Sequence, residues 1–148
     1  MKLAVTNSSF SAALLYRLSH FTGCKYGEGL GRVLSRLNLV INGIDIDFRA
    51  RIGPGVLLQH PVGVVIGGDC DLGANVTLMS GVVLGRRDVV NGPDIGAYPS
   101  LGDDVLVGAG TVVLGPVIVG HGVRIGAHSL VLANVESGAT VVGRWTGR

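Results

Sequence analysis

The sequence is short of aromatic residues, of charge and of long apolar runs. Only 5% of its 148 residues are aromatic and 15% are charged, and the formal net charge is +2. The basic residues are scattered, so no nucleic-acid partner is expected. No run of about 18 apolar residues occurs, and therefore no segment is expected to span a membrane.

Cysteine is also scarce. Cys24 and Cys70 lie in different kinds of segment, so a metal pair is not expected, and free thiols in a reducing compartment are the simpler interpretation. The start of the chain has one lysine and no long apolar core, which makes a poor signal peptide. We expect a cytoplasmic protein, one domain by length, without a bound metal.

Glycine and aliphatic residues are abundant instead. Glycine accounts for 25 residues, and 47% of the chain is hydrophobic. The usual glycine share is about 7%, so this chain needs many tight or left-handed backbone positions. The absence of a Gly-X-Y period excludes collagen, and the apolar content excludes disorder.

A six-residue repeat explains this composition. The leading positions of successive hexads are Leu101, Val107, Val113, Val119, Ile125, Val131 and Ser137. Glycine follows five of these seven positions. Earlier in the chain the pattern passes through Ile46, Ile52 and Leu58, slips by two residues, and resumes at Ile66.

A period of six fits neither a helix nor a simple strand. It predicts a triangular coil, in which each hexad supplies one short strand and one corner, and residues 18 apart stack on one face. The alternative is a glycine-rich β-sandwich with coincidental spacing, which the unbroken register disfavours.

The first 43 residues differ from the repeat. Leu14, Leu18 and Phe21 fall at helical spacing, the segment from Gly23 to Gly31 predicts a break, and a second short helix is expected to end near Gly43. We therefore divide the chain into a helical cap, residues 1–43, and a β-helix, residues 44–148. A solenoid needs such a cap at its open end.

One polar segment leaves the register between Leu84 and Leu101. In a solenoid, an insertion of this kind usually builds a binding surface, and the alternative is a plain surface loop.

His60 stands out among the four histidines because it lies at the two-residue slip, where the coil must be irregular. Asp45 precedes it by about one coil turn, so stacking brings the carboxylate toward the imidazole. A histidine base oriented by a carboxylate suits removal of a proton from a hydroxyl. The spacing alone leaves open whether His60 is this base or a structural histidine.

Several segments together resemble the serine acetyltransferases of the hexapeptide-repeat superfamily. They are the hexad string and the runs 42–46, 63–67 and 107–110, with 16–21 and 34–38 resembling the preceding helices. The resemblance covers nearly the whole chain but only the C-terminal part of a full-length member, since the larger helical domain of the family is absent.

The resemblance implies an all-β fold, a left-handed parallel β-helix, with acetyl-CoA bound between the β-helices of a homotrimer. It implies that His60 and Asp45 form the catalytic dyad, and that the acceptor hydroxyl attacks the thioester directly. The positions that match the CoA channel are Gly85, Ala109, Arg124 and Ala127. A 148-residue prism with flat apolar faces also favours a trimer on physical grounds.

The departures from the family concern the acceptor. Gln59 replaces an aspartate, and Ala97 replaces an arginine that would pair with a carboxylate. These losses favour a neutral sugar hydroxyl, bound by Gln59, Asn91 and Tyr98, as in the short members associated with exopolysaccharide synthesis.

Three functions therefore stay open. The first is an acetyl-CoA-dependent O-acetyltransferase acting on a sugar or polysaccharide precursor. The alternatives are a truncated serine O-acetyltransferase and a non-catalytic β-helix with a structural or regulatory role.

Overall fold

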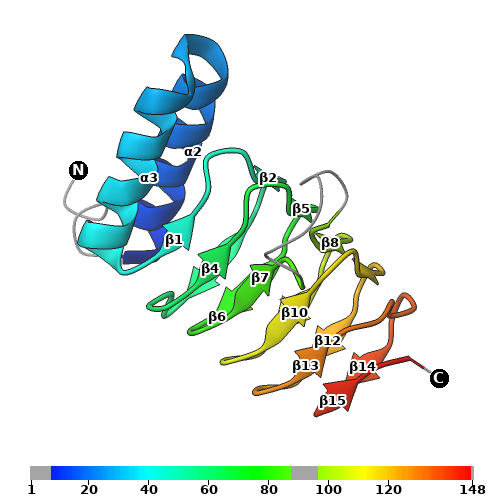
Figure 1. Ribbon diagram of the computed structural model, residues 1–148. Helices are drawn as coiled ribbons and strands as arrows, with labels where there is room; N and C mark the ends of the chain where they lie inside the picture. The colour runs from blue at the N-terminus through cyan, green and yellow to red at the C-terminus, as the bar shows by residue number, and fades with distance from the viewer. Residues whose placement is uncertain (1–7, 88–96, 148) are drawn as a thin grey trace.

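The computed structural model describes residues 8–87 and 97–147. Two helices come first, α2 (Ser8–Tyr26) and α3 (Glu28–Asn42), and they lie side by side as a hairpin above the first coil (Figure 1). The strands that follow are β1 (Asp45–Ile46), β2 (Arg51–Ile52), β3 (Leu57–Gln59), β4 (Val65–Ile66), β5 (Asp71–Leu72), β6 (Thr77–Met79), β7 (Val83–Gly85), β8 (Ser100–Leu101), β9 (Leu106–Val107), β10 (Val112–Leu114), β11 (Ile118–Val119), β12 (Arg124–Ile125), β13 (Leu130–Val131), β14 (Thr140–Val141) and β15 (Arg144–Trp145).

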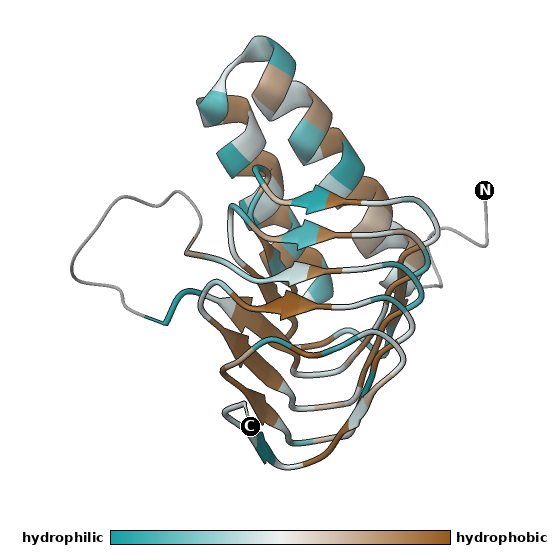
Figure 2. Ribbon diagram, turned by 90° about the vertical axis from the view of Figure 1, so that its right-hand side faces the viewer, coloured by the Kyte–Doolittle hydropathy of each residue, from teal (hydrophilic) through white to brown (hydrophobic). Residues whose placement is uncertain are grey.

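The strands form three parallel sheets that the chain visits in turn. The first sheet has the order β1-β4-β7-β10-β13-β15, the second β2-β5-β8-β11, and the third β3-β6-β9-β12-β14. Since every third strand pairs with its counterpart one coil later, each hexad supplies one strand, as predicted, and the coils lie one above another (Figure 2). This arrangement fits the predicted left-handed β-helix.

The strand register confirms both irregularities expected from the sequence. Val112 pairs with Leu130, 18 residues later, which is the regular coil. Asp45 pairs with Val65, 20 residues later, so the first coil holds the two extra residues of the slip at His60. The excursion before Leu101 separates β7 from β8.

The hexad leaders form the core, with one exception. Leu78, Val107, Val113 and Ile125 are fully buried, and in each two-residue strand of the regular coils the second residue points inward. Ser137 is exposed, so the prediction that it leads a seventh hexad is wrong. Val135 takes the inward place instead and bridges to Val119, because the last coils are shorter.

Left-handed backbone recurs once per coil at two of the corners. Between the second and third sheets the residues with positive φ are Gly55, Asn75, Asp104, Gly122 and Gly138. Between the third and first sheets they are Gly43, Gly63, Gly81, Gly110, His128 and Gly143. Glycine, asparagine and aspartate tolerate this conformation best, which accounts for part of the high glycine content.

The predicted helix break at residues 23–31 is wrong in extent, because only Gly27 separates the two helices. Gly23 and Gly31 lie within α2 and α3, where they make room for the ring of Phe48 from the first coil. A Cβ atom on Gly23 would lie 2.3 Å from Phe48 Cδ2, and one on Gly31 would lie 2.8 Å from Phe48 Cγ. These glycines therefore serve packing and not chain reversal.

Polar contacts also attach the hairpin to the first coil. The Tyr16 hydroxyl donates to the Ala50 carbonyl at 2.7 Å, and His20 Nδ1 lies 2.7 Å from the Phe48 carbonyl oxygen. Neither described helix is long and apolar enough to cross a membrane.

Candidate active site

Asp45 and His60 lie at one corner of the first coil, where the third sheet leads into the first. Asp45 opens β1, and its N–H donates to the Val64 carbonyl at 2.9 Å. His60 directly follows β3, and the turn after it is tied back by Gly63, whose N–H donates to Gly43 O at 2.8 Å. Among the described residues no hydrogen bond or ion pair joins the two side chains, so the dyad stays a prediction.

The backbone of His60 is unusual. Its φ is 50°, in the left-handed region that favours glycine, and its side chain is exposed. The regular left-handed position of this corner is already occupied by Gly63, so His60 is an additional one. Non-glycine residues in this region are uncommon and concentrate at functional sites.

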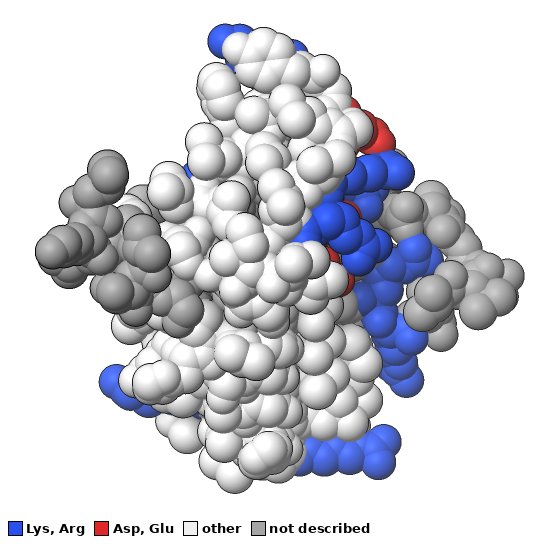
Figure 3. Space-filling view, turned by 90° about the vertical axis from the view of Figure 1, so that its left-hand side faces the viewer, with Lys and Arg blue, Asp and Glu red and all other residues white. Residues whose placement is uncertain are grey.

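A cavity of about 260 Å³ opens beside Asp45, between α3 and the first coil. Its lining residues are Arg32, Ser35, Arg36, Asp45, Asp47, Phe48 and Arg49. Figure 3 shows Lys and Arg side chains gathered on this side of the molecule, next to the helical hairpin. The cavity therefore offers both signs of charge to a small ligand.

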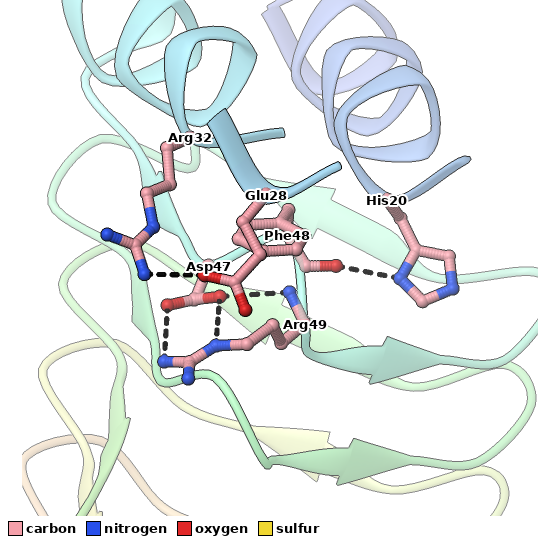
Figure 4. A network of polar contacts seen from close by, with 6 residues as sticks. All are labelled: His20, Glu28, Arg32, Asp47, Phe48 and Arg49. Atoms are coloured by element: carbon pink, nitrogen blue, oxygen red, sulfur yellow. Dashed lines mark hydrogen bonds and ion pairs between the residues drawn. The ribbon is translucent and has the colours of Figure 1, made fainter. Parts of the chain in front are cut away.

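Most of these charges have partners (Figure 4). Arg49 contacts both carboxylate oxygens of Asp47 at 3.1 Å, and this hydrogen bonding raises the pKa of Arg49. Arg32 pairs with Glu28 at 2.7 Å.

Two groups at the cavity are without a partner in the described part of the chain. The Arg36 guanidinium makes no hydrogen bond or ion pair there, and the buried Ser35 Oγ has no hydrogen-bond partner. A buried hydroxyl without a partner costs about 1–3 kcal/mol, which a bound polar ligand would recover.

The residues predicted to bind CoA fall into two places. Ala109 and Ala127 lie at the same corner as His60, further along the solenoid, and His128 N donates to Ala109 O at 2.8 Å. Gly85 ends β7 at the opposite end of the first sheet, and exposed Arg124 begins β12 in the third sheet. One chain thus lines up the two alanines with His60 but not Gly85 or Arg124.

The predicted acceptor residues are not brought together within one chain. Gln59 is exposed at the end of β3, at the His60 corner. Half-buried Tyr98 packs at the far end of the first sheet, where a Cβ on Gly67 would lie 2.2 Å from its ring. Asn91 lies outside the described residues. A pocket that uses both Gln59 and Tyr98 would need residues from two copies.

The sequence analysis missed Ser35, Arg36, Asp47 and Arg49. Arg32 and Arg36, four positions apart, indicated one basic helix face, but nothing in the spacing showed that this face lies beside Asp45. No group of three or more His, Cys, Asp or Glu side chains suited to a metal ion occurs within residues 8–87 and 97–147.

Comparisons with known proteins identify the family. Residues 98–133 match the model of the bacterial transferase hexapeptide family, which describes six repeats. The serine acetyltransferase of Helicobacter pylori is 42% identical over 132 residues, which cover 89% of this chain and 75% of that protein. The chain belongs to the serine acetyltransferase family.

Solved structures agree. The serine acetyltransferase of Neisseria gonorrhoeae in complex with serine gives a TM-score of 0.86 at 33% identity, covering 93% of this chain and 55% of that one. The soybean apoenzyme gives 0.88 at 35% identity, covering 93% and 56%. This chain therefore spans little more than half the length of these two structures.

These relatives confirm the predicted enzyme class, an acetyl-CoA-dependent acyltransferase. They do not support the preference for a sugar acceptor or the association with exopolysaccharide synthesis, because the relatives are named for serine. The loss of charge at Gln59 and Ala97 suggested the sugar, but sequence positions alone did not show that Arg36 and Arg49 lie beside Asp45.

Proposed function

We propose that this chain is a serine O-acetyltransferase, which moves the acetyl group of acetyl-CoA to the hydroxyl of L-serine. The observation that carries the proposal is the 42% identity to a serine acetyltransferase over 89% of the chain. The common corner of Asp45 and His60 and the left-handed backbone of His60 support it.

In the proposed reaction His60 is the general base. Its imidazole takes the proton of the serine hydroxyl as the oxygen attacks the thioester carbonyl, and Asp45 orients the ring and stabilises the imidazolium. Collapse of the tetrahedral intermediate breaks the carbon–sulfur bond. The imidazolium then protonates the departing thiolate, which gives O-acetylserine and CoA and returns His60 to its neutral form.

The cavity beside Asp45 supplies what a zwitterionic acceptor needs. We assign the serine carboxylate to Arg36, whose guanidinium makes no pairing in the described residues, in place of the arginine that Ala97 replaces. Asp47 supplies negative charge for the ammonium group, although it shares that charge with Arg49. A charged ligand in a partly enclosed site needs partners of this kind.

Acetyl-CoA is assigned to the column that runs along the solenoid from His60 past Ala109 and Ala127, because small side chains there leave room for an extended molecule. Gly85 and Arg124 lie away from this column. Their predicted contacts with CoA therefore require a groove between two copies, which is also what the proposed trimer provides.

The test is the loss of thioester absorbance from acetyl-CoA with L-serine or a panel of sugars as acceptor. We expect serine-dependent turnover that falls by roughly 10²–10⁴-fold in His60→Ala. The matched control is His121→Gln, an exposed corner histidine that pairs with Asp103, and it should keep the turnover of the parent chain.

Arg36→Ala separates acceptor binding from chemistry. A charged hydrogen bond contributes about 1.5–3 kcal/mol, so KM for serine should rise by roughly 10-fold or more while KM for acetyl-CoA stays constant. Turnover with a sugar and none with serine would refute the serine assignment. Turnover that His60→Ala leaves intact would refute the dyad.

A further inference from the structure

The α2–α3 hairpin buries small and polar side chains between its helices. Asn38 Nδ2 donates to the Ala12 carbonyl at 3.0 Å, and Asn42 Nδ2 donates to Asn38 Oδ1 at 2.9 Å. A Cβ on Gly31 would lie 2.8 Å from Gly23 Cα, so the two backbones approach closely there. A surface helix usually buries its apolar stripe, and this hairpin does the opposite.

The large apolar side chains of the hairpin lie outside. On α2 they are Leu14, Leu18 and Phe21, exposed by 47%, 45% and 55%. On α3 they are Val33, Leu37 and Val40, exposed by 57%, 42% and 81%. We call these two sets the α2 edge and the α3 edge. Their spacing of three and four residues places each set on one face of its helix.

The two edges point in opposite directions. At about 100° per residue, each set lies roughly 180° around its helix from the positions that contact the other helix. The hairpin is thus a two-helix layer with an apolar edge on either side, and apolar segments occur along both helices in Figure 2. On the α3 edge, Val33, Leu37 and Val40 line an apolar groove of about 310 Å³ together with Arg32 and Arg36.

We propose that the α2 edge of one copy of this chain packs into the α3 edge of a second copy. Two different patches on opposite sides of one element are the requirement for a head-to-tail contact, which closes into a ring. A two-fold contact needs only one patch. A membrane surface would reach one edge and leave the other in water.

The exposed area fits this contact. Large side chains that are half exposed leave on the order of 300 Å² per edge, and therefore about 600 Å² per copy in a ring. Stable interfaces bury about 800 Å² per partner, and the flanking side chains Leu30 and Ile41, both exposed, extend the α3 edge. The groove beside Arg36 would then be covered by the neighbouring copy, next to the cavity at Asp45.

Cysteine cross-linking tests the contact independently of catalysis. In a Cys24→Ser background, whose remaining Cys70 is buried, Leu18→Cys and Leu37→Cys are combined and treated with a short bismaleimide. We expect covalent dimers and higher species with the double variant and monomers with either single variant. The matched control combines Leu18→Cys with Val142→Cys, which is 76% exposed on the last coil, and should stay monomeric.

Three outcomes would overturn the proposal. Dimers from Leu18→Cys alone would show a two-fold contact through the α2 edge. No cross-link in the double variant would separate the edges. Sedimentation of the untreated protein with phosphatidylserine vesicles, without cross-linking in solution, would assign the edges to lipid.

Discussion

Phe48 holds the helical hairpin on the first coil, and this contact makes a prediction with a change of sign. The ring is 4% exposed and lies between Gly23 and Gly31. The only atoms that a Cβ on Gly23 would meet closely belong to the Phe48 ring, at 2.3, 2.8 and 3.0 Å. Gly23→Ala therefore probes the ring and little else.

The magnitudes follow from two opposing effects. Alanine in place of glycine inside a helix stabilises by about 1 kcal/mol, and overpacking a core costs about 1–3 kcal/mol. In the parent chain Gly23→Ala should be neutral to destabilising by about 2 kcal/mol. Phe48→Ala should cost about 3–5 kcal/mol, and in that background Gly23→Ala should stabilise by about 1 kcal/mol, because the ring is gone.

The assay is urea unfolding followed by far-UV circular dichroism, at one protein concentration because association changes apparent stability. Gly29→Ala is the control, since a Cβ there meets nothing within 4 Å, and its effect should be equal in both backgrounds. The difference for Gly23→Ala should give a coupling free energy of about 1–3 kcal/mol. An equal effect in both backgrounds would refute the wedge.

The cysteines give two further predictions. A thiol reagent should label Cys24 in the folded protein and both cysteines in urea, because Cys24 is exposed and Cys70 is buried; labelling of both at equal rates without urea would contradict the buried position. Burial raises the pKa of the Cys70 thiol from 9.0 to about 12, so the folded state favours the neutral thiol. The resulting stability is complete below pH 9 and should fall by up to about 1.4 kcal/mol per pH unit between 9 and 12, a slope that Cys70→Ala should lack in alkaline urea titrations.

The solenoid was predictable from the sequence because its repeat is local. Each aliphatic leader is followed by its corner within a few residues, so six-residue spacing was enough to place Val107 and Ile125 in the core. The slip at His60 was visible as two extra residues. Ser137 was misplaced because the last coils are shorter, and a repeat counted forward does not register a shortening whose residues are equally small.

The helical segment and the acceptor cavity were less predictable. Glycine in a sequence predicts a break, but Gly23 and Gly31 are needed for Phe48, which no local pattern reveals. The charges beside Asp45 come from α3 and from the first corner. Their meeting depends on how the hairpin docks, which is a tertiary event. The analysis of Gln59 and Ala97 therefore counted the charges that were missing and not those supplied from elsewhere.

The left-handed columns at the corners constrain how this kind of gene can change length. Asp104 and Gly122 occupy equivalent places in successive coils, so removing the 18 residues from one to the next would join two ends of the same backbone geometry. A deletion one residue longer or shorter would turn inward-facing aliphatic residues toward water. Insertions and deletions should therefore survive in whole coils, or at a corner where the chain already leaves the coil, as it does between β7 and β8.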